Sequence, residues 1–387
     1  MLRAAVRNVL VPAGLAVGLF LLLEGGCRLS GRIRTGDWPI TRAEAYTELV
    51  RGIGRAYQAH PYLVVCGRPN VVLRAVGKEI HFNARGERGT NVLDLLVPKP
   101  AGHFRVVCEG GSSTFDLLAE NNAATWPARL GTLLAERDVD VANAGFPGWT
   151  SLESLVSLLI RDLELSPDLV IVLSGVNDLQ PAGHIPFSPD YRLGHAELLP
   201  RVTGVAPIPL RLASRSLLVE SLRDFLRPGR SVDAEGFAPA YEWAGGDPKD
   251  DIPEAAVAVY ERNLRSIAAV AAASGAKVLL VAQAARIRVD RKAADEAYVR
   301  SWTPGLSMGG FSKGLARFNG VSKRLGDEGV AFFVDPFLES RFSDADFADP
   351  FHFSPSGSEK LARHLADLVT GRYLAPPRAR DPATIAR

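Results

Sequence analysis

Five short apolar runs, separated by stretches with helical spacing, constrain the fold of this chain more than any other feature. The runs lie at 104–108, 139–142, 169–173, 277–282 and 330–334, and the helical stretches at 117–135, 152–163, 255–273, 314–325 and 356–369. Strands that are apolar along almost their whole length are typical of a parallel sheet with helices on both faces. The alternation therefore predicts an α/β domain of three layers, doubly wound around a mostly parallel five-stranded sheet, over residues 104–372.

The rest of the chain divides around this domain. Residues 36–103 combine short β-prone runs with turn residues, and we expect a small β-containing preface there. The alternation breaks at about 180–255 and at 284–312, which predicts two insertions, the second of them irregular. Residues 373–387 are rich in Pro, Ala and Arg, a composition typical of a flexible tail.

The first 35 residues predict a membrane anchor. Arg3 and Arg7 precede an uncharged, mostly apolar run, Val9–Leu23, and no small-residue cleavage site follows it. Basic residues before an apolar run mark a signal peptide or a signal anchor. We expect an uncleaved anchor with basic flank, with a cleaved signal as the alternative, and a following domain outside the cytoplasm, in the periplasm or at the cell surface.

Composition excludes two functional classes. Lys and Arg number 45 against 43 Asp and Glu, and they are scattered rather than gathered in a stripe, so nucleic acid is not an expected partner. The three cysteines, Cys27, Cys66 and Cys108, have no CxxC spacing, which leaves a metal site unsupported. We expect neither a metal nor a cofactor.

Polar and glycine residues follow the first three apolar runs, where an open α/β sheet forms its site. Ser112 stands in Gly-Gly-Ser-Ser-Thr after the first run, Gly148 in Asn-Ala-Gly-Phe-Pro-Gly after the second, and Asn177 in Gly-Val-Asn-Asp after the third. A serine in such a turn is a candidate nucleophile, and the backbone N–H groups of Ser112 and Gly148 with the Asn177 amide are candidate oxyanion donors. Each motif alone also suits an ordinary helix cap or turn.

A fourth motif supplies the missing chemistry. Asp349-Pro-Phe-His352 lies between the last apolar run and the last helical stretch. A serine nucleophile needs a base, usually histidine, and that base needs a carboxylate to orient it. Together the four motifs predict a catalytic triad of Ser112, His352 and Asp349 for acyl transfer.

These motifs resemble the four blocks of the SGNH (GDSL-like) hydrolase superfamily, in its membrane-anchored bacterial form, over roughly residues 104–370. The resemblance implies a flavodoxin-like sheet, Ser112 as nucleophile, Gly148 and Asn177 in the oxyanion hole, and Asp349 with His352 as the acid–base pair. One position departs from the pattern, because the eponymous Asp before the serine is Gly111 here. Asn83-Ala84-Arg85-Gly86 also resembles the preface of anchored members.

The substrate is less constrained than the reaction. We expect a small-molecule or glycan ester, such as an O-acylated sugar, with the aromatic residues Trp149 and Trp302 in contact with it, and Phe146 and Trp243 as further candidates for the wall. The alternatives are an O-acyltransferase acting on a cell-surface polysaccharide, and a catalytically inactive anchored binding module. A nucleotide-binding protein is disfavoured, because the Gly-rich turn lacks the Walker lysine and a third glycine.

Overall fold

A single parallel sheet forms the centre of the molecule. The computed structural model describes residues 2–35, 52, 55–75, 77–90, 94–184, 186–191, 216–226 and 247–374. The strands of the sheet are β5 (Phe104–Gly110), β6 (Val139–Asn143), β7 (Leu169–Leu173), β8 (Lys277–Val281) and β9 (Phe332–Val334). They are ordered β6-β5-β7-β8-β9, and all four neighbouring pairs are parallel. This is the doubly wound order of flavodoxin-like sheets, so the predicted fold class is confirmed.

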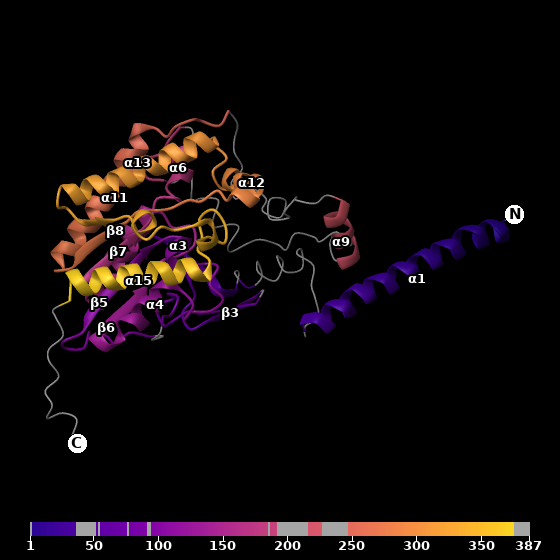
Figure 1. Ribbon diagram of the computed structural model, residues 1–387, viewed down its shortest axis with the longest axis horizontal. Coiled ribbons are helices and arrows are strands. Elements are labelled where there is room, and N and C mark those ends of the chain that lie inside the picture. The colour runs from indigo at the N-terminus through magenta and orange to yellow at the C-terminus, as the bar shows by residue number, and fades with distance from the viewer. Residues whose placement is uncertain are drawn as a thin grey trace, which may run out of the picture.

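Helices cover both faces of this sheet (Figure 1). Helices α4 (Trp126–Leu133) and α15 (Pro355–Arg372) pack on one face, and α5 (Ser151–Ile160), α11 (Glu254–Ala273) and α13 (Met308–Asp327) on the other. Side chains of a strand alternate between its two faces. Strand β7 shows this directly, because Val170 and Val172 join the core under α11 while Leu169 and Ile171 join the core under α15.

Two local predictions were wrong. The expected helix at 117–135 is only α4, which begins where the Thr125 side chain accepts a hydrogen bond from the Ala128 N–H and Pro127 follows at the start. The expected irregular segment at 284–312 contains a helix, α12 (Lys292–Trp302). The shorter helices of the described chain are α3 (Ser112–Phe115), α6 (Leu179–Gly183) and α14 (Pro336–Glu339), with 3-10 turns at Ala135–Arg137, Asp162–Leu165, Val289–Arg291 and Asp344–Asp346.

The described part of the preface forms two small antiparallel sheets. Strands β1 (Tyr57–His60) and β2 (Val64–Gly67) make one, and β3 (Val72–Ala75) and β4 (Lys78–His81) make the other. Their buried side chains share one core cluster with Phe115, Phe146 and Trp149 of the main domain. The preface is therefore packed against the loops that follow β5 and β6.

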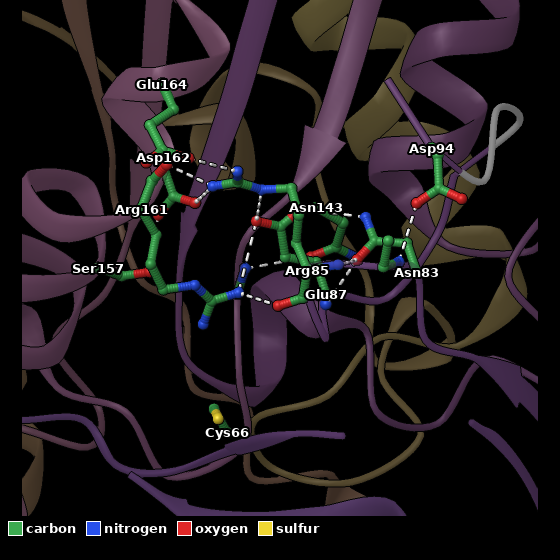
Figure 2. A network of polar contacts seen from close by, with 12 residues as sticks. Cys66, Asn83, Arg85, Glu87, Asp94, Asn143, Ser157, Arg161, Asp162 and Glu164 are labelled. Atoms are coloured by element: carbon green, nitrogen blue, oxygen red, sulfur yellow. Dashed lines mark hydrogen bonds and ion pairs between the residues drawn. The ribbon is translucent and has the colours of Figure 1, made fainter. Parts of the chain in front are cut away.

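A polar network also joins the preface to the main domain (Figure 2). The Arg85 guanidinium donates to Glu87, Glu164, Asp162 and the Arg161 carbonyl oxygen. Glu87 and Asp162 are buried, and burial, followed by the negative charge of Asp162, raises the pKa of Glu87 to about 7. Buried carboxylates need matched cations and donors, so Arg85 links the preface to the turn after α5.

Helix α1 (Leu2–Thr35) extends away from the α/β domain (Figure 1). Its segment Pro12–Arg34 is long and apolar enough to cross a membrane, by length and composition. Helix α9 (Leu217–Leu226), which belongs to the first predicted insertion, contacts α1. Most of the predicted insertion at 180–255, including Trp243, and residues 375–387 of the predicted tail at 373–387 lie outside the described residues.

Candidate active site

The turn after β5 places Ser112 at the start of α3. Gly110 has a φ of +149°, and a Cβ on it would lie 2.1 Å from the Leu173 carbonyl oxygen, so only glycine fits. Ser112 follows at the first position of α3 and is 9% exposed. The sharp turn thus holds the serine at the carboxyl edge of the sheet.

Asp349 and His352 form a hydrogen-bonded pair in the loop before α15. The imidazole Nδ1 of His352 lies 2.7 Å from Asp349 Oδ2, and Asp349 Oδ1 accepts the backbone N–H groups of Phe351 and His352 at 2.9 Å each. Burial acts to raise the pKa of Asp349, but His352 and these hydrogen bonds outweigh it and lower that pKa below its usual value. An ionised Asp349 fixes the ring with Nε2 pointing away from it.

The other ring nitrogen of His352 is available for a proton. His352 is 3% exposed, and its Nε2 is buried with no hydrogen-bond partner among the described residues. The two loops are joined next to the site, because Ser113 Oγ donates to the Phe351 carbonyl oxygen at 2.9 Å. No hydrogen bond joins the Ser112 hydroxyl to His352 in the described chain, and such contacts are often loose before substrate binds.

The predicted oxyanion donors surround the same turn. In the described chain no hydrogen bond occupies the backbone N–H of Ser112 or of Gly148. Asn177 Nδ2 donates one hydrogen to the Trp149 carbonyl oxygen at 2.8 Å, which leaves its second hydrogen to donate. A Cβ on Gly111 would lie 2.3 Å from this Nδ2, so the amide sits directly beside the residue that precedes Ser112.

The backbone conformation of Gly148 and the hydrogen bonds of Asp178 fix the positions of Gly148 and Asn177. Gly148 has a φ of +85°, a conformation that side chains rarely tolerate. Asp178, next to Asn177, is buried and accepts hydrogen bonds from the backbone N–H and hydroxyl of Ser151 and from the Tyr191 hydroxyl. Burial raises the pKa of Asp178 to about 7 despite these bonds. The hydrogen bonds between Ser151 and Asp178 therefore hold the loop after β6 at a fixed distance from the loop after β7.

Of the aromatic residues expected to touch the substrate, Trp149 and Phe146 are buried and Trp302 is half-buried. Trp149 and Phe146 are buried in the core shared with the preface, and the Trp149 indole donates to the Val65 carbonyl oxygen at 3.0 Å. This packing favours a structural role for both rings. Trp302 ends α12, is half-buried, and packs against the core beneath α11. The predicted substrate contacts of Trp149 and Trp302 stay predictions.

One residue of the site escaped the sequence reasoning. The fully buried guanidinium of Arg88 donates four hydrogen bonds, to the carbonyl oxygens of Phe115, Asp116, Ala119 and Asn121. These four residues follow Ser112 closely, so the preface fixes the backbone that comes directly after the Ser112 turn. The only signal was the Asn-Ala-Arg-Gly motif that begins five residues earlier, which marks the preface but not this contact.

Comparison with known proteins decides the family. Residues 108–360 match the model of the GDSL-like Lipase/Acylhydrolase family, which is more than half of the 387 residues. The chain belongs to the GDSL-like (SGNH) acylhydrolases. The match begins in β5 and ends in α15, so it includes Ser112, Gly148, Asn177, Asp349 and His352.

Solved structures of the same fold class are similar only at low identity. A lipase/acylhydrolase from Enterococcus faecalis is 18% identical, with 71% of this chain and 100% of that chain covered and a TM-score of 0.42. An acetylxylan esterase variant from Geobacillus stearothermophilus is 15% identical, with 72% and 97% covered and a TM-score of 0.39. A structure of TesA is 18% identical, with 69% and 98% covered and a TM-score of 0.37. A search of curated proteins gave no significant match.

Proposed function

We propose that this GDSL-like acylhydrolase is a serine esterase with Ser112 as nucleophile, His352 as base and Asp349 as the orienting acid. The observation that carries the proposal is the His352 ring, which is bonded to Asp349 through Nδ1 while its buried Nε2 has no partner in the described chain. An ionised acid, an oriented base and a serine in a sharp turn are the parts that nucleophilic catalysis requires.

The reaction proceeds in two halves. His352 Nε2 takes the hydroxyl proton of Ser112 while Ser112 Oγ attacks the ester carbonyl carbon. The N–H groups of Ser112 and Gly148 and the Asn177 amide stabilise the resulting oxyanion, and His352 returns the proton to the leaving alcohol. Water then attacks the acyl-enzyme by the same steps, releasing the acid and restoring Ser112. An acceptor hydroxyl in place of water would make the reaction an acyl transfer.

We propose that α1 anchors the chain in a membrane, with the α/β domain on the outer side in the periplasm or at the cell surface. Helix α1 carries an apolar segment of membrane-spanning length, and its large apolar side chains are exposed rather than packed on the domain. At that location the substrate class we propose is an O-acylated glycan or a smaller ester of the same kind.

Labelling with a fluorophosphonate probe tests the catalytic assignment. We expect the full-length protein to be labelled and Ser112→Ala to lose all labelling, because the probe forms a bond with an activated serine hydroxyl. Ser113→Ala is the matched control, since Ser113 stands in the same turn but its hydroxyl is bonded to the Phe351 carbonyl oxygen. Labelling of Ser112→Ala would overturn the nucleophile assignment.

Product analysis then separates the two reaction types. Acetylated xylan or another acetylated glycan is supplied with and without a free acceptor glycan, and acetate and acetylated acceptor are both measured. Acetate release that the acceptor does not reduce supports an esterase. Acetylated acceptor formed faster than acetate would identify an O-acyltransferase, and an unlabelled, inactive but folded protein would identify a binding module.

A further inference from the structure

Glu24 is placed at one end of the uncharged part of α1. It is the single acidic residue of the helix and follows sixteen uncharged residues, 8–23. At about 1.5 Å per residue those sixteen residues cover roughly 24 Å, close to the ~30 Å thickness of the hydrocarbon core of a bilayer. Within the candidate span Pro12–Arg34, Glu24 is therefore the residue at which the uncharged stretch ends and the charged flank begins, on the side of the α/β domain.

The Glu24 carboxylate is bonded to the beginning of α9, almost two hundred residues away in the sequence. It accepts the Ser216 hydroxyl at 2.8 Å and the backbone N–H groups of Leu217 and Leu218 at 3.1 and 2.9 Å. Arg28, one turn further along α1, donates to the same carboxylate at 2.8 Å. Glu24 thus serves as the N-cap acceptor of α9 and satisfies N–H groups that α9 itself cannot.

Helix α9 has apolar residues at helical spacing, and both α9 and α1 carry exposed apolar side chains. Apolar residues recur at 218, 222 and 226 of α9, between the charged residues Glu220, Arg223 and Asp224 of its sequence. Leu222 is 54% exposed, and on α1 Leu22 is 76% exposed beside Glu24. A short helix with one apolar face and charges on the other is typical of helices that lie in the plane of a membrane surface.

We propose that α9 lies in the membrane interface beside the anchor, held there by the contact between Glu24 and its N-terminus, and that its partner is the lipid bilayer. The proposal rests on the proposed anchoring by α1. The chain then meets the membrane at two places, the anchor and a helix of the first insertion. These two helices, α1 and α9, contact each other outside the α/β domain (Figure 1). This second contact restricts how the α/β domain can turn about its anchor.

Fluorescence quenching in liposomes tests this placement. The full-length protein carries Cys27→Ser, because Cys66 and Cys108 are buried and Cys27 is not. An environment-sensitive fluorophore is attached at Leu222→Cys or, as the matched control, at the neighbouring exposed polar position, Ser221→Cys. In phosphatidylcholine liposomes with nitroxide-labelled lipid, we expect quenching at position 222 to exceed that at 221 several-fold.

A second variant tests the role of Glu24. Glu24→Ala should lower the quenching at position 222 to the level at 221, while flotation with liposomes and fluorophosphonate labelling stay unchanged. Arg34→Ala is the control for a charge removed from α1, because Arg34 donates to the Ser30 carbonyl oxygen within the same helix. This variant should show the same quenching at position 222 as the parent protein. Equal quenching at 221 and 222 in floating protein would overturn the interfacial placement alone. Protein that does not float would overturn the anchoring as well, and labelling of Ser112 reports the esterase assignment independently.

Discussion

Asp349 and Glu109 each stand three residues before a residue of the proposed triad, and their pKa values shift in opposite directions. Asp349 stands three residues before His352 and receives hydrogen bonds on both oxygens, so its pKa is lowered despite burial. Glu109 stands three residues before Ser112, inside β5, and its buried carboxyl faces the carboxyl of Asp162 rather than an N–H donor of the described chain. Burial, followed by the negative charge of Asp162, raises the pKa of Glu109 well above its usual value. Hydrogen-bond donors therefore keep the half-buried Asp349 charged, whereas the fully buried Glu109, without such donors among the described residues, favours its protonated form.

The largest effect should come from removing the charge of Asp349. Asp349→Asn keeps the size of the side chain but presents an amide to His352, which favours the wrong ring tautomer. We expect kcat for ester hydrolysis to fall on the order of 10⁴-fold, the size of the effect in other Ser–His–Asp enzymes. Glu109→Gln is the same change in the contrasting carboxyl and should keep kcat within a few-fold. A comparable fall in both variants would contradict the distinction between the two carboxyl groups.

Loss of an oxyanion donor should have the next largest effect. Asn177→Ala removes the only side-chain donor proposed for the oxyanion, and a single donor typically contributes about 10²–10³-fold to kcat. Gly111→Ala should cause a loss of similar size, because the added Cβ would lie 2.3 Å from Asn177 Nδ2 and displace the amide.

The double variant tests whether Gly111 acts through Asn177. Kinetics of Gly111→Ala, Asn177→Ala and the combination form a double-mutant cycle. We expect the combination to lose little more than Asn177→Ala alone. Fully multiplicative losses would mean that Gly111 supports the turn by a route other than the amide.

The sequence suggests candidate site residues where the chemistry sits in a short motif after a strand. The apolar runs located the strands, and parallel strands bring their carboxyl ends to one edge, so the sequence alone places Ser112, Gly148 and Asn177 in one region. Asp349 and His352 were found because their partnership is local. The confirmed fold class rests on the same alternation of strands and helices.

Contacts between distant segments were not predictable in this way. Arg88 looks like any arginine in a turn-rich stretch, and its four carbonyl partners lie about thirty residues further along the chain. Glu109 lies just after the predicted apolar run 104–108, and nothing in its sequence neighbours shows that Asp162 approaches it. Helix α12 was missed because flanking Pro, Gly and charged residues hid its short apolar pattern, whereas packing against the core stabilises it.

The buried Glu109 should make stability depend on pH in the direction opposite to that expected from Asp349. A raised pKa in the folded state gives stability that is present below the unfolded pKa, about 4.5, and is lost as pH rises toward the folded value. Over that range each additional proton held by the folded state changes the free energy of unfolding by about 1.4 kcal/mol per pH unit.

Glu109→Gln should remove the part of this slope that Glu109 contributes, while the parts that come from the raised pKa values of Glu87 and Asp178 remain. Glutamine resembles the protonated acid and does not titrate, so the variant should lose less stability than the parent between about pH 5 and pH 8. Urea unfolding of the full-length protein in detergent, at several pH values, measures the difference. Parallel pH profiles for the parent and the variant would show that Glu109 does not hold the extra proton.

The smallest effect should come from Trp149, which links the site to the preface. Trp149→Phe removes the hydrogen bond to the Val65 carbonyl oxygen, and a lost bond of this kind costs about 0.5–1.5 kcal/mol of unfolding free energy, with a further cost for the smaller ring. If the indole only packs against the preface, KM for an acetylated glycan should stay unchanged while urea unfolding shifts to lower concentration. A raised KM with unchanged stability would restore Trp149 as a substrate contact, and would place the glycan against the face of the site that the preface covers.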